Sequence, residues 1–138
     1  MKYLFQILFL LLLFVSCQSA KHSSNSENDK HEISIAQNDS VEYELIVFDS
    51  RFETYLVTQP HPQWFYSDEY YKQWNNRYTI EWNIRHGNPL HYGDFYETHI
   101  PYDLNTDYGI EFNFRLYHYF QFIEKEYNIV LISRRGTT

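Results

Sequence analysis

The sequence predicts a small α+β domain of order β-α-β-α-β, in which two long, aromatic-rich helices pack on a roughly three-stranded sheet. Short apolar runs with strand character alternate with two longer segments that carry helix start and stop signals. The first forty residues differ in composition from the rest and are set aside as a leader and a tether. Of the 138 residues, those at 41–138 then suffice for one modest hydrophobic core.

The amino terminus has the pattern of a lipoprotein signal peptide over residues 1–16. Lys2 supplies a positive charge, and the apolar run that follows is too short to cross a bilayer, which takes about 20 residues. The run ends in Ser16 and Cys17, which resemble the lipobox of bacterial lipoproteins, where the cysteine is acylated and becomes the new amino terminus. We therefore expect a lipid on Cys17 that holds the protein to a membrane. The alternative is an ordinary secretory signal with an incidental cysteine.

Residues 17–40 are interpreted as the lipidated cysteine and a flexible tether. The segment has no aromatic residue and is rich in Ser, Asn and charged side chains, so it buries too little apolar surface to offset its ordering entropy. Gln18 follows Cys17, so the aspartate signal for inner-membrane retention is absent, as is an acidic export signal. We expect an outer-membrane anchor facing the periplasm, with the inner membrane and the cell surface as alternatives.

Composition and motifs narrow the classes of function. The formal net charge is −7, and no basic patch offsets it, so a nucleic acid is not expected as a partner. Cys17 is the only cysteine, which leaves the folded part without disulfides or thiol chemistry. The sequence contains no glycine-rich phosphate loop, nucleophile elbow or HExxH motif, so we expect no cofactor and favour a non-enzymatic role.

Local signals place the elements of the first half. Residues 41–48, VEYELIVF, have the alternation and apolar content of a strand. A short helix is predicted next, ended by Pro60 and Pro62. Ser67, followed by two acids, is typical of a helix N-cap, and the helix is expected to run to about His86, where Gly87 and a later proline end it.

The second half is predicted to hold two strands and one helix. Alternation in residues 94–101 indicates a strand, and the run 128–133 is β-rich. Between them, polar caps at Asn105–Asp107 start a helix that continues to about Tyr127.

Three charged residues in the first long helix form the main candidate site. Arg77, Glu81 and Arg85 are spaced four apart and fall in the middle of the apolar arc. The arc carries Trp74 and Trp82 and extends to Ile80 and Ile84, while Asn75 and Thr79 fall on the opposite, polar side. One interpretation is a structural network in which Glu81 bridges both arginines and an acid elsewhere, Glu97 or Glu111, balances the charge. The other is an aromatic-walled pocket for a carboxylate, phosphate or sugar, with hydrolysis possible at Glu81.

The second long helix carries an additional apolar stripe formed by Ile110, Phe114 and Tyr117. A helix that is apolar on two sides is either buried centrally or touches a partner. The stripe is therefore a candidate surface for an envelope protein, unless the loop with Trp64 and Phe65 covers it.

Glu97 and His99 are weaker candidates for a metal site or an acid–base pair. At i and i+2 on a strand they would share one face, but the spacing matches no established set of metal ligands. A solvent face explains them better, and no metal site is assigned. His86 is likewise interpreted as an exposed cation at the end of a helix.

The segments WFYSDEYYKQWNNRYTIEWNIRHGNPLHYGDFYE and DYGIEFNF, together with VTQP, resemble a family of small lipoproteins of unknown function from Bacteroidota-type bacteria. The resemblance covers the whole folded domain and implies lipidation and an envelope location, but it transfers no catalytic residue. Two hypotheses follow. The first is an envelope-anchored lipoprotein that docks a protein or has a structural role; the second is a domain that binds, and could hydrolyse, a small ligand or glycan.

Overall fold

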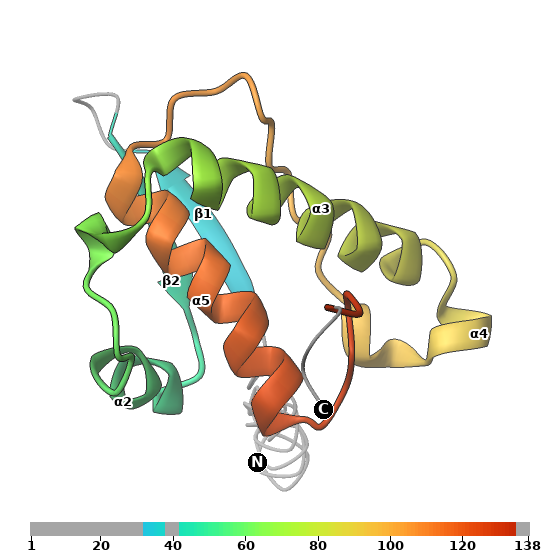
Figure 1. The fold of residues 1–138 in the computed structure, drawn as a ribbon. Coiled ribbons are helices and arrows are strands. Elements are labelled where there is room, and N and C mark those ends of the chain that lie inside the picture. Colours follow the sequence, from blue (N-terminus) through green and yellow to red (C-terminus); the bar gives the residue numbers. More distant parts are fainter. Residues whose placement is uncertain (1–31, 38–41, 135–138) are drawn as a thin grey trace, which may run out of the picture.

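A computed structural model describes residues 32–37 and 42–134, which form a small α+β fold (Figure 1). The described part begins with a β-hairpin of two antiparallel strands, β1 (Ile33–Gln37) and β2 (Tyr43–Val47). Ile33 lies opposite Val47, and Ile35 lies opposite Leu45. The predicted signal peptide and Cys17 lie outside the described residues.

Strand β1 corrects the predicted extent of the tether. The segment 17–40 was interpreted as flexible, yet Ile33–Gln37 within it pairs along its whole length with β2. Ile33 is buried in the core, as is Leu45 of the neighbouring strand. The composition of the surrounding residues hid this short alternating stretch, and the folded part therefore begins before residue 41.

The two elements that follow β2 agree with the predicted short helix and its stop. Helix α2 (Arg51–Val57) begins after Asp49, whose carboxylate accepts the backbone N–H of Arg51 at 2.9 Å. Its buried Phe52 contacts Phe122 edge to face. Past the prolines, a single 3₁₀ turn, η2 (Gln63–Phe65), leads to the next helix.

Helix α3 (Asp68–His86) has the predicted limits. The Ser67 hydroxyl accepts the backbone N–H of Tyr70 at 3.2 Å, as expected for an N-cap. Gly87 ends the helix, and Pro89 occupies the first turn of a further short helix, α4 (Pro89–Tyr92).

The buried face of α3 differs from the predicted one. Ile80 and Ile84, placed in the apolar arc, are 53% and 55% exposed. The side facing the core instead carries Tyr71, Asn75, Tyr78, Thr79 and Trp82. Burial of the polar Asn75 is compensated in part by a 2.9 Å hydrogen bond from its amide nitrogen to the carbonyl oxygen of Asn113. The predicted buried side of α3 was wrong because Ile80 and Ile84 were assigned to the core by their apolar character, whereas Asn75 was assigned to the surface.

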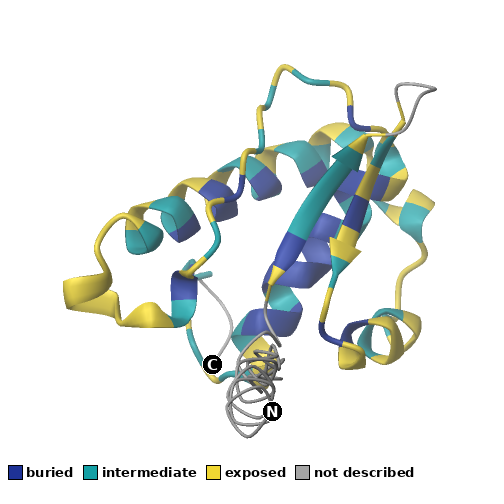
Figure 2. Cartoon of the chain, turned by 180° about the vertical axis from the view of Figure 1, so that it is seen from behind, coloured by how far each residue is buried: buried dark blue, intermediate teal, exposed yellow. Residues whose placement is uncertain are grey.

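Helix α5 (Ile110–Glu126) is the centre of the molecule. It contacts α3, β2, α2 and η2, which cover most of its apolar surface, while Ile110 and Phe114 stay only partly buried. Figure 2 shows its buried face behind the hairpin. It starts after Gly109, which adopts a left-handed φ of 80°, rather than at the predicted caps Asn105–Asp107. Asp107 instead accepts the backbone N–H of Gly109 at 3.2 Å.

Neither of the two later predicted strands forms within 32–37 and 42–134, so the sheet there has two strands instead of three. Residues 94–101 contain a 3₁₀ turn, η3 (Asp94–Tyr96), and an irregular segment. There the Asn83 side chain takes the place of a strand partner, accepting the N–H of Ile100 at 3.0 Å and donating to its carbonyl at 2.9 Å. In the segment predicted as a strand at 128–133, the backbone of residues 130–132 is likewise hydrogen-bonded by the side chains of Glu124 and Arg85.

Aromatic rings make up most of the core. Tyr78 stacks on Phe120 with ring centroids 5.0 Å apart, and Trp82 contacts Tyr96 edge to face at 5.0 Å. Buried tyrosines need partners for their hydroxyl groups, and Tyr71 donates to the carbonyl of Gln63 at 3.1 Å. The core therefore combines ring packing with specific hydrogen bonds between distant segments.

Candidate functional site

Glu81 and Arg85 form the predicted ion pair, with 2.7 Å between Arg85 Nε and Glu81 Oε1. The Arg85 side chain is 14% exposed, and its other nitrogens donate to the Tyr96 hydroxyl at 2.7 Å and to the carbonyl of Val130 at 2.8 Å. Burial disfavours the arginine's charge, but its bonds to Tyr96 and Glu81 keep the pKa of Arg85 above its usual value. The guanidinium therefore links three segments of the chain.

Arg77 lies apart from this pair. It is exposed, and its guanidinium carbon lies 4.6 Å from the centre of the Trp74 ring. Within the described ranges it makes no ion pair with Glu81, and neither Glu97 nor Glu111 balances the arginines. The predicted three-membered network is thus reduced to Glu81 and Arg85.

Trp82 is too deep to form the wall of an open pocket. It is 1% exposed, and its indole N–H donates to the carbonyl of Thr98 at 2.7 Å. Trp74 is only partly buried. The five residues predicted as one site therefore divide into a core residue, a half-buried ion pair and a surface Arg77–Trp74 contact.

The residues after α5 form an extended segment, 128–134, that we name the C-terminal arm. It lies between α5 and α3 (Figure 1). Glu124 of α5 accepts the backbone N–H groups of Leu131 and Ile132 at 2.8 and 3.1 Å. Arg85 of α3 donates to the carbonyls of Val130 and Leu131 at 2.8 and 3.3 Å. The carboxylate of Glu124 thus binds the N–H groups of the arm, and the guanidinium of Arg85 on the other helix binds its carbonyls.

The last described residue, Arg134, fixes the end of the arm. Its guanidinium donates to the Tyr78 hydroxyl at 2.6 Å and to the Tyr117 hydroxyl at 3.3 Å, and it lies 4.6 Å from the centre of Trp74. Tyr78 in turn donates to Glu124 at 3.1 Å. Burial opposes the charge, but the two phenol oxygens hold the pKa of Arg134 above its usual value.

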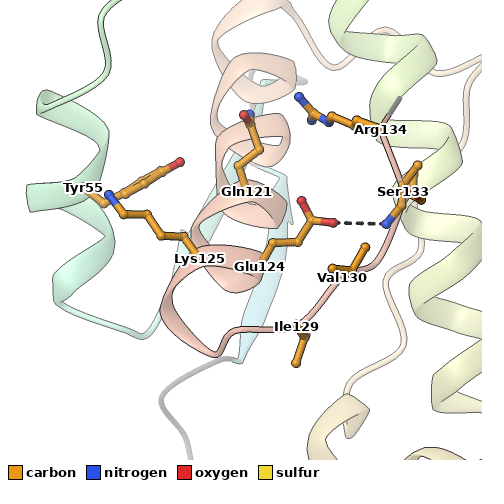
Figure 3. A pocket seen from close by; sticks show the side chains of 9 residues that line it. Tyr55, Gln121, Glu124, Lys125, Ile129, Val130, Ser133 and Arg134 are labelled. Atoms are coloured by element: carbon orange, nitrogen blue, oxygen red, sulfur yellow. Dashed lines mark hydrogen bonds between the residues drawn. The ribbon is translucent and has the colours of Figure 1, made fainter. Parts of the chain in front are cut away.

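A cleft of about 450 Å³ opens between the arm, α5 and α2 (Figure 3). Gln121, Glu124 and Lys125 project from α5 toward it, and Val130, Ser133 and Arg134 border it from the arm. Lys125 lies 5.4 Å from the centre of the Tyr55 ring on α2. Glu124 points across the cleft to the arm and is occupied by the backbone hydrogen bonds already described.

The second apolar stripe divides between core and surface. Tyr117 is 4% exposed and contacts Tyr71 of α3 at 5.4 Å, so it is not available to a partner. Phe114 is half-buried against the same ring at 5.6 Å. Trp64 and Phe65, predicted as a cover, are 79% and 49% exposed; Tyr71 of α3 covers Tyr117 and one side of Phe114 instead.

Ile110 is the member of the stripe that borders open space. It lines a cleft of about 570 Å³ that we name the acidic cleft. Its lining comes from residues 42–45 at the start of β2, from Gln63, and from residues 108–112 and 115 around the start of α5. The residues are Glu42, Tyr43, Glu44, Leu45, Gln63, Tyr108, Gly109, Ile110, Glu111, Phe112 and Arg115.

Arg115 is the one cationic side chain among those lining residues, and Glu53 already neutralises it. The two side chains form a salt bridge at 2.5 Å, and the Arg115 guanidinium also lies over the Phe52 ring at 5.4 Å. The acidic cleft therefore presents three glutamates around apolar side chains.

The histidines and the weaker candidates lie elsewhere. Glu97 and His99 are exposed and are not on a strand, and no group of three potential metal ligands gathers within the described residues. His86, expected to be exposed, is half-buried and its Nδ1 lies 2.7 Å from the carbonyl oxygen of Tyr96. His118, which the sequence did not single out, is buried, and burial next to Arg134 lowers its pKa to about 4.

Residues 4–136 match a protein family described as a family of unknown function, DUF6146. The chain belongs to this family. Searches among curated proteins and among solved structures gave no significant match. In this DUF6146 chain, none of the helices in the described part is long and apolar enough to cross a membrane.

Sequence reasoning missed Glu124 and Arg134. Their roles depend on the arm folding back over α5, and neither local periodicity nor a motif reports such a return. The unusual pair Arg134–Arg135 near the end of an acidic chain was the one available signal, since a cation in a domain rich in tyrosine tends to find an aromatic partner.

Proposed function

We propose that the chain is an envelope-anchored lipoprotein whose folded domain is a non-enzymatic docking module for a basic segment of another envelope protein. The leader and Cys17 supply the anchor, and the outer membrane facing the periplasm is the proposed location. The observation that carries the docking role is the acidic cleft, in which Ile110 and other apolar side chains are surrounded by Glu42, Glu44 and Glu111.

The chemistry of the acidic cleft favours a particular class of partner. An apolar floor with a like-charged rim suits a segment that inserts one apolar side chain and places Lys or Arg at the rim. Glu44 and Glu111 are exposed, so they steer and select a basic segment more than they add to its affinity. A partner of opposite charge is also consistent with the acidic balance of the whole chain.

The fate of the candidate catalytic residues supports a binding role over a hydrolytic one. Glu81, the proposed acid or base, is bonded to Arg85, and Arg85 is occupied by the backbone of the arm. A hydrolase would need at least one of these groups to reach a substrate. Glu81 and Arg85 therefore stabilise the fold, and the proposed binding surface is the acidic cleft.

Site-specific photocrosslinking in the native envelope tests the proposal. A photoreactive amino acid in place of Ile110 is expected to give one discrete adduct whose partner peptide is rich in Lys or Arg. The same amino acid in place of Leu90, an apolar residue on α4 that is fully exposed, serves as the matched control and is expected to give none. The double change Glu44→Lys and Glu111→Lys should abolish the Ile110 adduct.

Equal adducts at Ile110 and Leu90, or an Ile110 adduct that survives both charge reversals, would contradict the proposal. Circular dichroism of each variant checks that the fold is kept.

A second candidate function, binding of a small anionic or sugar ligand, is favoured by the Arg77–Trp74 contact. Arg77 is exposed, lies on an indole ring and has no ion-pair partner among the described residues, so its donors are available to a carboxylate or hydroxyl. Arg77→Met would abolish such binding, measured by calorimetry against a panel of sugar acids, while leaving the Ile110 adduct intact.

A further inference from the structure

Residues 54–67, which we name the uncharged loop, differ in composition from the rest of the fold. They run from the last turns of α2, through η2, to the N-cap of α3, and they contain no Asp, Glu, Lys or Arg. No other stretch within residues 32–134 is as long without such a residue. The two acids that border the loop, Glu53 and Asp68, each form a salt bridge with a basic side chain. A chain of formal net charge −7 thus has a neutral segment here.

The uncharged loop exposes large apolar side chains. Val57 and Trp64 are 82% and 79% exposed, and Phe65 is 49% exposed. In Figure 1 the chain from α2 through η2 forms one edge of the molecule, at the opposite end from α4. The acidic cleft takes only Gln63 from this loop, so the proposed docking site does not explain why these three side chains are exposed.

Hydrogen bonds inside the uncharged loop satisfy the backbone at the end of α2. The Tyr55 carbonyl accepts the backbone N–H of Thr58 at 3.1 Å, the Thr58 hydroxyl at 2.7 Å and the Gln59 amide at 2.9 Å. Pro60 and Pro62 follow, and a proline has no N–H to leave unpaired. The segment can therefore leave water with few unpaired backbone groups, which are costly to bury.

Contacts on both sides of Trp64 fix the turn that carries it. His61 stacks on Phe65 with ring centroids 3.8 Å apart, and the Gln63 carbonyl accepts the hydroxyl of Tyr71 from α3 at 3.1 Å. These contacts hold the neighbours of Trp64 while its own side chain projects into solvent. The turn is therefore already ordered, and little conformational entropy is lost when it meets a surface.

We propose that the uncharged loop is a membrane contact, in which Val57, Trp64 and Phe65 enter the interfacial region of a phospholipid bilayer. Tryptophan combines an apolar ring with a polar N–H and is enriched at the membrane–water interface. Acidic side chains, which a bilayer disfavours, are absent from the loop. A protein-binding surface commonly has a polar, charged rim around its apolar centre, and the uncharged loop has no charged residue to form one.

The inference rests on the proposed lipid anchor at Cys17, which would keep the loop close to a bilayer. Residues 18–31 separate Cys17 from Glu32, and even fully extended they span at most about 50 Å. Such a short link gives the bilayer a high effective concentration at the loop, so a weak contact suffices. The Glu32 carbonyl accepts the N–H of Phe48 at 3.1 Å, so the link enters the fold just before α2. The lipid and the uncharged loop together would fix which side of the domain faces the membrane.

Quenching by brominated phospholipids tests the contact. Cys17 is the only cysteine, so the chain 17–138, which contains every described residue, can be coupled through it to a maleimide lipid in vesicles of phosphatidylcholine and phosphatidylethanolamine. We expect bromine to reduce the emission of Trp64 by roughly half, because an interfacial ring lies at the level of the headgroups. This emission is the difference between the unchanged chain and Trp64→Phe. Leu90→Trp in the Trp64→Phe chain is the matched control, since Leu90 is fully exposed on α4, and should not be quenched.

A charge placed in the loop should remove the contact. Val57→Asp introduces a carboxylate that a bilayer disfavours, and it should lower the quenching of Trp64 several-fold. Ile84→Asp makes the same kind of change at a position of α3 that is 55% exposed and should leave the quenching unchanged. Circular dichroism checks that both variants fold. An unquenched Trp64, equal quenching at positions 64 and 90, or equal effects of the two aspartates would overturn the proposal.

A photoreactive amino acid in place of Trp64 identifies the occupant in the native envelope. A phospholipid adduct is expected, and a protein adduct in its place would assign the loop to a protein and overturn the membrane contact. Mass spectrometry of the native Cys17 peptide tests the anchor separately. An unacylated Cys17 would contradict the proposed anchor, whereas the vesicle experiment attaches the chain chemically and decides independently whether the loop enters a bilayer.

Discussion

Arg85 shows which of its two predicted roles, a structural network or a ligand pocket, the contacts of the fold agree with: the guanidinium pairs with Glu81 and holds other segments of the chain. Its three guanidinium nitrogens make four hydrogen bonds, to Glu81, to Tyr96 and to two carbonyls of the arm. Local spacing was enough to predict the i,i+4 pair with Glu81. It gave no information on the carbonyls of residues 130 and 131, which lie 45 residues or more further along the chain.

Removal of the Glu81 charge should therefore lower the stability of the fold. Glu81→Gln loses the charge-assisted bond to a side chain that is 14% exposed, and we expect the free energy of unfolding to fall by about 1 kcal/mol. Urea denaturation measures it. Glu97→Gln, a chemically identical change at an exposed position, is the control and should be neutral. A loss of equal size in both would show that the pair with Arg85 contributes nothing.

His118 should make the fold sensitive to mild acid. Burial lowers its pKa to about 4 from about 6.5 in the unfolded chain. Between these values the unfolded state binds the extra proton, so the stability present above pH 6.5 is lost as the pH falls toward 4, by roughly 3 kcal/mol at most. Urea unfolding at pH 7 and pH 4.5 measures the loss.

His118→Gln should reduce this pH dependence markedly. A histidine at 118 that titrates near pH 6.5 by nuclear magnetic resonance in the folded protein would contradict the prediction.

Among the elements, α3 shows what local sequence can and cannot determine. Ser67 and Gly87 act on the backbone of their own neighbours, so the limits of α3 were predictable. Its orientation about its axis depends on which residues α5 presents, and Asn75 is buried because Asn113 supplies a partner. The strands predicted at 94–101 and 128–133 failed for a related reason, since side chains of α3 and α5 bond their backbones.

The orientation of α3 makes a clear mutational prediction. Trp82→Ala removes a large ring that is 1% exposed and its bond to Thr98, and should cost about 3–5 kcal/mol of unfolding free energy. Ile84→Ala changes a residue that is 55% exposed and should cost less than about 0.5 kcal/mol. Chemical denaturation compares them. If the isoleucine change were as damaging as the tryptophan change, the helix would face the other way.

For the whole molecule, the unexpected element is β1. The predicted class, α+β with aromatic-rich long helices, holds for the described residues, whereas the predicted start at residue 41 leaves out a strand that contributes to the core. Five residues inside a polar stretch are a weak signal. The alternation of Ile33 and Ile35 indicates a strand only once it is known that these residues pair with Val47 and Leu45 of β2.

A chain that begins at residue 41 should consequently be much less stable than the full chain. It lacks Ile33 and leaves Leu45, which is 2% exposed in the complete fold, without its opposite strand. We expect a loss of several kcal/mol, since two buried aliphatic contacts and a full set of strand hydrogen bonds disappear. Thermal unfolding of this chain and of one that begins at residue 30 measures the difference. Equal melting temperatures would show that β1 is dispensable.

The position of β1 also has a mechanical consequence. With a lipid on Cys17, any pull between the membrane and a bound partner would be transmitted through the tether to Ile33, the first residue of β1. Ile33 pairs with Val47 at the open end of the hairpin, and only five residues resist the load. Under tension β1 would separate from β2 before the helices unfold. The separated strand would lengthen the link between the membrane and the folded domain, and the helices and their aromatic contacts would stay intact while the proposed partner remains bound.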